Sequence, residues 1–516
     1  MSSTSTVQSL IRDLIAHGVT DAVLAPGSRS GPLALGLHAA DQQGLIRLHV
    51  RVDEREAAFL ALGLANASRR LVPVITTSGT AVANLHPAML EALHANVPVL
   101  AITADRPGRL RGTGANQTTE QREIFPGVPT VSEPVGIDGP AHLNLELDEP
   151  LIEPTEWDFS FDPAPIERIN GQTLVESFDE ALRTVVVAGD DARQPARILA
   201  EAAGFPLLAE PTSGARNGDN ALIAYRLLLG HSPLAEQIER VVSFGHTTLS
   251  RPVTQLLSRT DIEIVHVGDQ STFPVPAGKN VTFVSDVVAD PDDPAWLSSW
   301  LEADRAATAA IDGVLDGTTP YDLARTINQA VPAEGLLFVG SSNPIRDLDL
   351  VARPYPVGER RLIIGNRGLA GIDGTLSTAI GAALARESSR AIAYVGDLTF
   401  LHGSNGLLIG PDEPRPDLTI VVASDDGGSI FSTLEQGAPE YADAFERVYA
   451  TPTGADIGSL CRGYGVPHRT VSIAEVAAAL DEPASGIRVL EVPVDRLGRQ
   501  DLATRIDAAV RAAVRL

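Results

Sequence analysis

The sequence predicts an α/β protein built from three successive doubly wound parallel sheets. Short runs of apolar and β-branched residues alternate with longer segments whose apolar residues recur at helical spacing, a pattern typical of parallel sheets covered by helices. Two stretches rich in proline and acidic residues, 153–167 and 288–296, interrupt the alternation. At 516 residues, the chain has the length of about three ordinary domains.

The first unit, which we place at residues 1–165, contains four segments that we expect to be strands. They are DAVLAPGS, IRLHVRV, PVITTSGT and VPVLAITADRP. Between them, residues 54–70 and 81–97 have the apolar periodicity of helices. GPAHLNLELDEPL then leads into residues 153–167, which we interpret as a linker because proline and acidic residues dominate there.

The middle unit, residues 166–330, offers the strand candidates TVVVAGD, RVVSFGH, IEIVHVGD and VTFVSDV, followed by a break at 288–296 and a helical segment. The third unit, residues 331–516, opens at LLFVGSSNP. Its further strand candidates are RLIIGNRG, AIAYVGD, LTIVVASDD and IRVLEVPV. TLSTAIGAALARESS (375–389), between RLIIGNRG and AIAYVGD, is predicted as a helix.

Charge and hydropathy exclude several classes of function. A net charge of −26 repels nucleic acids and anionic membranes, so an anionic ligand needs a local group of cations. No apolar run approaches the roughly 18 residues that cross a bilayer. The N-terminal MSSTSTVQSL lacks the order of charged and apolar residues found in signal peptides, and we therefore expect a cytoplasmic protein.

Lysine and cysteine are almost absent from the chain. Lys279 is the only lysine among 40 basic residues, and it does not stand in a phosphate-binding-loop motif. Any Schiff-base chemistry would depend on it alone. Cys461 is the only cysteine, which excludes an intrachain disulfide and a cysteine zinc cluster. The dinucleotide, serine-hydrolase and zinc-protease motifs are missing as well.

Glycine- and acid-containing loops follow several of the predicted strands. In open parallel sheets ligands bind at the carboxyl ends of strands, although any single loop of this kind is more often an ordinary turn. VGDLTF and VVASDDGGSIF end consecutive predicted strands and deliver two acids, Asp397 and Asp425. Oxygen ligands of this type suit Mg²⁺, which commonly completes its coordination with phosphate and water.

Glu54 stands at the start of a predicted helix, directly after LHVRV. Acids in the first turn of a helix usually complement its dipole. Asp53 and Glu56 here have the spacing of an N-cap residue and its capping-box partner. By position alone, Glu54 is therefore an ordinary first-turn acid.

A wider pattern changes this interpretation. Asp397, followed nearly thirty residues later by Asp425, one further residue and Gly427, resembles the metal–diphosphate motif of thiamine-diphosphate enzymes. Within that superfamily, eight segments together resemble the MenD family: APGSRSGPL, VDEREAAFLALGLA, TTSGTAVANLHPAMLEA, TADRP, GANQT, GNRGLAGIDGTLST, GDLTFLHGSNGLL and GGSIFS. The resemblance is dense in the first and third units and thin in the middle unit.

The resemblance implies the three-domain fold of thiamine-diphosphate enzymes, with a pyrimidine-binding first unit, a Rossmann-like middle unit and a diphosphate-binding third unit. It implies thiamine diphosphate and Mg²⁺, or Mn²⁺, as cofactors. Asp397, Asp425 and the carbonyl of Gly427 would ligate the metal. Glu54, in the matching motif VDER, would be the catalytic glutamate whose carboxyl group bonds to the aminopyrimidine ring of the cofactor.

Further cofactor contacts follow from the same resemblance. Ile372 would be the apolar support beneath the bent cofactor. The complete set of implied cofactor contacts is Glu54, Ser78, Gly79, Thr80, Ile372, Gly396, Gly428, Ser429, Ile430 and Phe431.

The family decarboxylates 2-oxoglutarate and adds the succinyl carbanion equivalent to isochorismate, giving 2-succinyl-5-enolpyruvyl-6-hydroxy-3-cyclohexene-1-carboxylate in menaquinone biosynthesis. Each substrate carries two carboxylates, and arginine pairs with carboxylate through a planar, permanently charged fork. The implied substrate contacts are Ser28, Arg29, Arg106, Asn116, Gln117, Arg251, Ser342, Arg346 and Arg367. Gln117 and Ser28 would also share in proton transfer.

The resemblance also implies a homodimer whose active sites are shared between subunits, possibly within a tetramer. Two other interpretations remain open. An acetolactate-synthase-like carboligase would keep Glu54 and the metal loops but use a small uncharged acceptor, and the arginine set argues against it. A regulatory relative without turnover would not need Glu54 and the metal loops intact.

Overall fold

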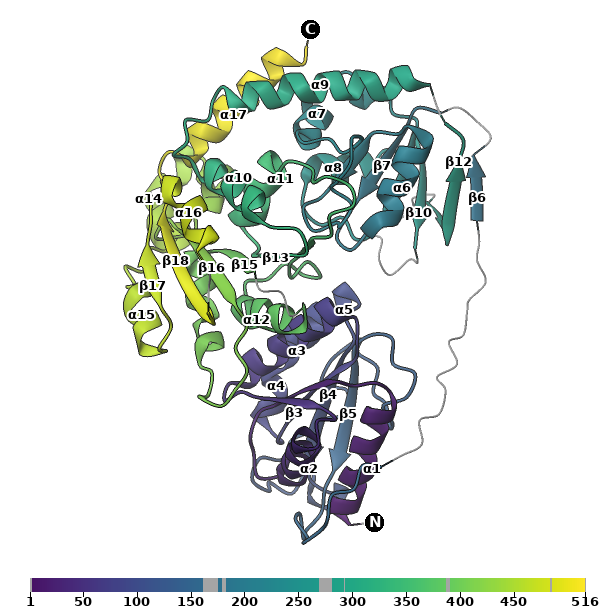
Figure 1. Cartoon of the computed structure of the whole chain (residues 1–516), viewed down its shortest axis with the longest axis vertical. Coiled ribbons are helices and arrows are strands. Elements are labelled where there is room, and N and C mark those ends of the chain that lie inside the picture. Colours follow the sequence, from purple (N-terminus) through teal and green to yellow (C-terminus); the bar gives the residue numbers. More distant parts are fainter. Residues whose placement is uncertain are drawn as a thin grey trace.

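The computed structural model describes residues 2–160, 175–178, 182–268, 281–291, 293–386, 390–482 and 485–515. These residues form three large parallel sheets of five, five and six strands and one two-stranded parallel sheet. Helices cover the sheets, so the predicted α/β class with three parallel sheets is confirmed (Figure 1). The exact unit boundaries stay predictions. Lys279 and residues 161–167 of the predicted linker lie outside the described residues.

The first sheet has the strand order β2-β1-β3-β4-β5. Its strands are β1 (Asp21–Leu24), β2 (Arg47–Val50), β3 (Val72–Thr76), β4 (Val99–Asp105) and β5 (Ala141–Glu146). The helices of this unit are α1 (Ser3–Ala16), α2 (Gly31–Gln42), α3 (Glu54–Ser68), α4 (Thr80–Asn84) and α5 (His86–Ala95). The four predicted strands are present. The predicted helix at 81–97 is two helices, because the chain breaks at Leu85 and Pro87 opens the second.

The described start of the predicted linker packs on the first unit. Phe159 is only 1% exposed and belongs to the core beneath α1 and α2. The carbonyl of Asp158 accepts hydrogen bonds from Gln8 Nε2 and Arg12 Nε, both at 2.9 Å. We interpret this stretch as a linker, and its described aromatic residues supply apolar surface that the first unit buries.

The second large sheet has the order β11-β10-β9-β7-β8. Its strands are β7 (Thr184–Ala188), β8 (Leu207–Ala209), β9 (Arg240–Phe244), β10 (Glu263–Val267) and β11 (Val281–Val284), and β6 (Val175–Phe178) pairs with β12 (Asp286–Ala289) apart from it. The helices are α6 (Arg193–Ala203), α7 (Tyr225–His231), α8 (Arg251–Leu257), α9 (Pro294–Asp312) and α10 (Pro320–Ala330). The prediction of VTFVSDV as a single strand is wrong. The chain bends at Ser285, and the two halves of the segment join different sheets.

The third sheet has the order β14-β13-β15-β16-β18-β17. Its strands are β13 (Leu336–Val339), β14 (Leu362–Ile364), β15 (Ala391–Gly396), β16 (Leu418–Ser424), β17 (His468–Thr470) and β18 (Ile487–Pro493). The helices are α11 (Asn343–Val351), α12 (Thr375–Arg386), α13 (Asp397–His402), α14 (Ala442–Phe445), α15 (Ile457–Gly463), α16 (Val476–Asp481) and α17 (Arg499–Ala513). All five predicted strands are present; the short β17 was not predicted.

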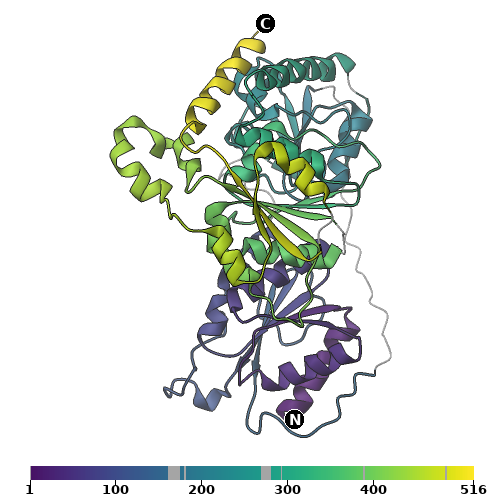
Figure 2. The same cartoon turned by 60° about the vertical axis from the view of Figure 1, so that its left-hand side comes forward.

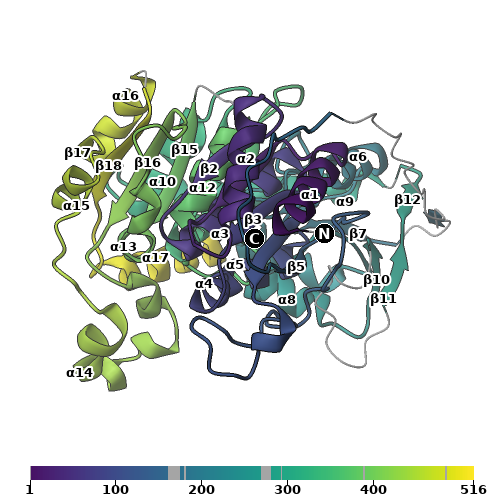
Figure 3. The same ribbon diagram turned by 90° about the horizontal axis from the view of Figure 1, so that it is seen from below.

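The third sheet lies between the other two units (Figure 2). One buried cluster joins α3 of the first unit to α12 and the third sheet, and another joins the middle unit to the opposite face of that sheet. The segment around α14 extends away from the third sheet (Figures 2 and 3). Within the described ranges, no helix is long and apolar enough to span a membrane.

Helices α3 and α12 cross at unusually close range, and two glycines make this possible. A Cβ on Gly63 would lie 2.0 Å from the carbonyl oxygen of Thr378. On the facing helix, a Cβ on Gly381 would lie 2.3 Å from the carbonyl oxygen of Leu60. Because backbone meets backbone here, the crossing fixes how the first unit is docked on the third.

Candidate active site

Asp397 occupies the turn from β15 into α13 and is 5% exposed. Its Oδ1 accepts a hydrogen bond from the backbone N–H of Leu398 at 2.6 Å, and its Oδ2 accepts one from Gly427 at 3.0 Å. Gly427 has φ +151°, and a Cβ there would lie 2.5 Å from the carbonyl oxygen of Ala450. The Asp397 carboxylate is therefore fixed by backbone on two sides.

The second acidic loop lies beside the first because β15 and β16 are paired, with Gly396 opposite Ala423. Both loops line one cavity of about 170 Å³. Of the residues predicted for cofactor, metal or substrate, this cavity is lined by Ser342, Ile372, Gly396, Asp397, Asp425, Gly427, Gly428, Ser429, Ile430 and Phe431.

Burial raises the pKa of Asp397, and the hydrogen bonds that its carboxylate accepts from backbone N–H groups oppose this rise. Burial also raises the pKa of Asp425 to about 6; a hydrogen bond with Ser429 opposes this rise, and the negative charge of Asp397 adds to it. Two facing carboxylates whose charged forms are disfavoured are a suitable environment for a cation. In the described part of the chain, no three histidine, cysteine or acidic side chains are grouped so that they could hold a metal ion, and a metal here would therefore need oxygen ligands beyond the protein's carboxylates.

A buried ion pair lines the same cavity and was not predicted from the sequence. Arg499 of α17 bonds to Asp347 of α11, and both side chains are at most 5% exposed. Charge from Arg499 lowers the pKa of Asp425 against the effect of burial. Their separation of 152 positions leaves no local sequence signal that could have paired them.

Glu54 is the first residue of α3 and is half-buried. Asp53 is the N-cap, as predicted: its Oδ1 accepts hydrogen bonds from the N–H groups of Arg55 and Glu56. The capping-box role predicted for Glu56 is wrong. Glu56 is fully buried against α12, where it accepts a hydrogen bond from Ser377 Oγ at 2.6 Å, and burial raises its pKa to about 7.

Helix α3 is also tied to the end of α13 and to the turn behind it. Arg55 Nη2 donates to the carbonyl of His402 at 2.8 Å, and Asn405 Nδ2 donates to Asp53 Oδ2 at 3.0 Å. Glu54 is nevertheless absent from the cavity that holds Asp397. All described residues that line it lie between Pro320 and Arg499.

The other predicted residues of the first unit gather at the carboxyl ends of its strands. Arg106 Nη1 donates to Ser78 Oγ at 2.5 Å and to the carbonyl of Gln117 at 2.8 Å. Desolvation and the nearby charge of Arg29 lower the pKa of Arg106. Ser28, Thr80, Asn116 and Gln117 are exposed, and Gly79 is buried with φ +84°.

Two predicted arginines of the third unit form a second group of cations. Arg346 Nη1 donates to the carbonyl of Ser342 at 2.7 Å. Burial, followed by the charges of Arg367 and Arg226, lowers the pKa of Arg346. Arg367 is only 2% exposed, and its Nη2 donates to Thr248 Oγ1 at 2.9 Å.

Arg251 is exposed at the start of α8, three residues after Thr248, which binds Arg367. Among the described residues, neither Arg346 nor Arg367 is paired with a carboxylate in a salt bridge. The charge of Arg367 nevertheless acts on buried Glu210, whose pKa it lowers against the effect of burial.

Comparisons with known proteins agree with this geometry. The family model of the thiamine pyrophosphate enzyme N-terminal TPP-binding domain matches residues 4–124, and that of the C-terminal TPP-binding domain matches residues 349–492. The crystal structure of benzoylformate decarboxylase from Polynucleobacter necessarius aligns with a TM-score of 0.63, covering 96% of this chain and 99% of that one. At 16% identity, that likeness shows the fold alone.

Curated relatives resemble the chain along its whole length. The 2-succinyl-5-enolpyruvyl-6-hydroxy-3-cyclohexene-1-carboxylate synthase of Nocardioides sp. is 52% identical and covers 98% of each chain. The synthase of Kineococcus radiotolerans is 44% identical and covers 99% of each. With both thiamine-diphosphate-binding domains present, the chain belongs to the 2-succinyl-5-enolpyruvyl-6-hydroxy-3-cyclohexene-1-carboxylate synthase family.

Proposed function

We infer that this chain is a thiamine-diphosphate-dependent 2-succinyl-5-enolpyruvyl-6-hydroxy-3-cyclohexene-1-carboxylate synthase of menaquinone biosynthesis. The observation that carries this conclusion is 52% identity to a curated synthase over 98% of the chain. Its substrates are 2-oxoglutarate, which loses CO2, and isochorismate, which accepts the succinyl unit. The unit boundaries, the residue roles, the metal, the subunit arrangement and the cytoplasmic location are proposals.

The cavity of the third unit fits a metal–diphosphate group. Asp397 and Asp425 supply hard oxygen ligands, the Gly427 carbonyl is the proposed third, and the backbone of Gly428 and Ser429 lines the same space. When bound, thiamine diphosphate would supply an acidic ring carbon for attack on the keto group and an electron sink for decarboxylation. Mg²⁺ suits this ligand set, and Mn²⁺ accepts the same ligands.

Glu54 is assigned to proton transfer at the aminopyrimidine ring. Its position at the N-terminus of α3 leaves its carboxyl group half-buried, and no hydrogen bond to it occurs within the described part of the chain. A carboxyl group that is accessible and not engaged elsewhere can bond to a ring nitrogen.

The arginines are assigned to the substrate carboxylates. Arg29 and Arg106 hold one cationic region in the first unit, and Arg346 and Arg367 hold another in the third. In a chain with a net charge of −26, these local groups would provide the positive potential that anionic substrates need. Gln117 and Ser28, both exposed beside the first group, are assigned hydrogen bonds to the reacting substrate.

A two-fold dimer would complete the site. The cavity with Asp397 receives no residue of the first unit from its own chain, as far as the structure describes the residues that line it. Val52, two positions before Glu54, is 71% exposed, and Leu369, three before Ile372, is 52% exposed. Large apolar side chains exposed beside catalytic positions favour burial by a second subunit.

The activity is tested with purified protein, thiamine diphosphate, Mg²⁺ and 2-oxoglutarate, with and without isochorismate. We expect both substrates to be consumed together with release of CO2, and removal of the metal with a chelator to stop the reaction. Consumption of pyruvate in place of 2-oxoglutarate would instead indicate an acetolactate-synthase-like carboligase. Absence of any turnover in cofactor-loaded protein would indicate a regulatory relative.

A further inference from the structure

The loop between β14 and α12, residues 365–374, carries two of the proposed functional residues. Arg367 is assigned to a substrate carboxylate and Ile372 to the support of the cofactor. Between them, Ala370 has φ +57°, and Gly374 at the end of the loop has φ +51°. Left-handed backbone at a non-glycine residue is strained, so contacts from outside must hold this loop in place.

Glu91 of α5, in the first unit, makes such a contact. Its Oε1 accepts a hydrogen bond from the N–H of Gly368 at 2.6 Å, and its Oε2 accepts one from Leu369 at 2.7 Å. The side chain is 4% exposed, so these hydrogen bonds lie out of competition with water. A Cβ on Gly368 would lie 2.6 Å from the carbonyl oxygen of Glu91, so loop and helix touch directly.

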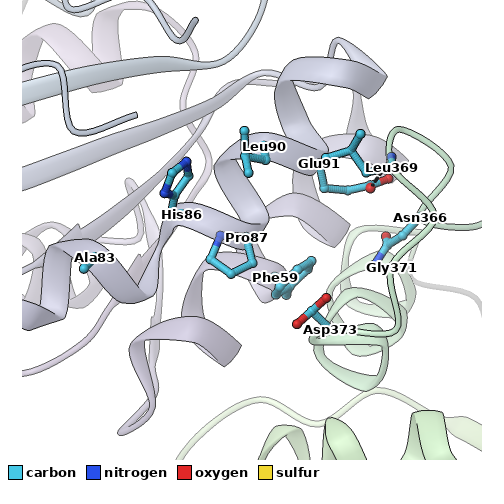
Figure 4. A pocket seen from close by; sticks show the side chains of 10 residues that line it. All are labelled: Phe59, Ala83, His86, Pro87, Leu90, Glu91, Asn366, Leu369, Gly371 and Asp373. Carbon is cyan, nitrogen blue, oxygen red and sulfur yellow. Dashed lines mark hydrogen bonds between the residues drawn. The ribbon is translucent and has the colours of Figure 1, made fainter. Parts of the chain in front are cut away.

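A cavity lies beside this contact between loop and helix. A cavity of about 420 Å³ lies between α5 and the loop, lined by Phe59, Pro87 and Leu90 of the first unit and by Asn366, Leu369 and Asp373 of the third. Figure 4 shows Glu91 reaching from its helix to the loop beside Leu369 at the edge of this cavity. Beside this cavity, the two hydrogen bonds to Glu91 tie the loop to α5.

The opposite side of Arg367 is held by the middle unit. Its guanidinium donates to Thr248 Oγ1 and to the carbonyl of Thr248. Glu210, 1% exposed, fixes that segment in turn, because its Oε1 accepts hydrogen bonds from the N–H groups of Thr248 and Leu249, both at 3.1 Å. The loop is thus held from both other units: Glu91 binds the two residues after Arg367, and Thr248 binds Arg367 itself.

We propose that Glu91 is a positioning residue for the synthase reaction: by binding the N–H groups of Gly368 and Leu369 it sets the position of Arg367 and Ile372. This inference rests on the proposed substrate role of Arg367. It assigns a task to a residue of the first unit that touches neither substrate nor cofactor. A misplacement of about 1 Å at a catalytic or binding group can cost up to about 100-fold in rate.

The test compares Glu91→Gln with Asp304→Asn. Asp304 is a matched control because it is 6% exposed and likewise accepts hydrogen bonds from two consecutive N–H groups, those of Ile223 and Ala224. We expect Glu91→Gln to lower kcat/KM by about 10- to 100-fold. The change should lie chiefly in the KM of one dicarboxylate, the same substrate whose KM rises in Arg367→Lys. Asp304→Asn should leave that KM unchanged, whatever it does to Tm.

Two further measurements separate positioning from general stability. Without cofactor or substrate, hydrogen–deuterium exchange of a peptide spanning 365–374 should rise in Glu91→Gln and not in Asp304→Asn. In the double variant Glu91→Gln/Arg367→Lys, the fold-decrease in kcat/KM should be smaller than the product of the two single fold-decreases, because both substitutions act through the guanidinium of Arg367. If the Gln variant does not fold, Glu91→Asp, which keeps the charge and shortens the reach, is measured in the same way.

Unchanged exchange and unchanged KM in Glu91→Gln would overturn the proposal, as would fully multiplicative losses in the double variant. Failure of the proposed function gives a different result. Wild-type protein loaded with cofactor would then show no turnover of 2-oxoglutarate and isochorismate, while the exchange experiment would still report whether Glu91 holds the loop.

Discussion

Asp397 and Glu54 are both strand-end acids assigned to the same cofactor, yet their surroundings differ. Asp397 is 5% exposed, has both carboxylate oxygens engaged by backbone N–H groups, and lines a cavity that, apart from Pro320, is built by its own unit. Glu54 is half-buried, lies beside the 71%-exposed Val52, and has no hydrogen-bond partner in the described ranges. One half of the proposed site is thus enclosed within a single chain, and the other half is open.

The contacts around α3 show that this difference is not caused by loose docking. Helix α3 is fixed on α12 by glycines at the crossing, and on the end of α13 by Arg55 and Asp53. The Glu54 end of the first unit is therefore held rigidly while remaining open to a partner. Such a surface is what a shared active site requires, since each chain would present a preformed half to the other.

The largest effect should come from Glu54→Gln, which keeps the shape of the side chain and removes its ionisable proton. General acid–base groups typically contribute about 10²- to 10⁴-fold, so turnover and exchange of the cofactor C2 proton should fall by that order. Binding of thiamine diphosphate, followed by calorimetry, should survive. Exchange at the wild-type rate would return Glu54 to the role of a first-turn helix acid.

The next effect concerns the cationic groups. Arg346→Ala should raise the KM of a dicarboxylate substrate by about 10- to 100-fold, because a charge-assisted pair with carboxylate is lost. The dissociation constant of thiamine diphosphate should change far less. Arg109→Ala, which removes an exposed ion pair with Asp148, is the control and should leave both constants unchanged. If the variant instead bound thiamine diphosphate more weakly and kept a normal KM for both substrates, Arg346 would contact the cofactor and not a substrate carboxylate.

The crossing of α3 and α12 can be broken with one methyl group. Gly381→Ala should destabilise the protein by about 1–3 kcal/mol or more, since the new Cβ would meet the carbonyl of Leu60 at 2.3 Å and backbone cannot rotate away. Gly230→Ala is the matched control: it lies in helix α7 with nothing within 4 Å of the added Cβ, and should stabilise by about 0.4–1 kcal/mol. Equal Tm values for the two variants would contradict the close crossing.

The smallest effect is a pH dependence at Glu56. Its pKa of about 7 in the folded protein lies above the usual 4.5, so the folded state keeps a proton that the unfolded state loses between these values. Its contribution to stability therefore falls as pH rises from about 4.5 to 7. Glu56→Gln cannot lose a proton, so its free energy of unfolding relative to wild type should rise between pH 5 and pH 7, by at most about 1.4 kcal/mol per pH unit. The exposed Glu302→Gln should show no such trend.

The sequence was informative wherever the signal was local. Strand-end turns such as Gly396-Asp397 combine a buried apolar run with a loop motif, and the structure places them as predicted, at the carboxyl edge of a parallel sheet. The N-cap at Asp53 was readable for the same reason. The three-residue strands β8 and β17 were not predicted, whereas the equally short β14 was recognised with the glycine-containing loop that follows it.

Contacts between units could not be predicted. Glu91 and Gly368 are 277 positions apart, and Glu56 and Ser377 are 321 apart. Each glutamate stands in a helix where its position suggests an ordinary polar residue, and burial is imposed only when a second unit docks. Glu56 also shows how a local rule fails: its spacing fits a capping box, but the hydroxyl of Ser377 engages its carboxylate at 2.6 Å.

The shared site is tested most directly by mixing two inactive chains. Glu54→Gln and Asp397→Ala are co-expressed with different tags, and dimers that carry both tags are isolated. In such a dimer one site would contain both substitutions, while the other would contain the unsubstituted Glu54 of one chain and the unsubstituted Asp397 of its partner. Randomly mixed chains should therefore recover about a quarter of wild-type activity, and purified mixed dimers about half, by two-fold symmetry. Inactive mixed dimers, formed from variants that each fold and dimerise normally, would contradict the shared site.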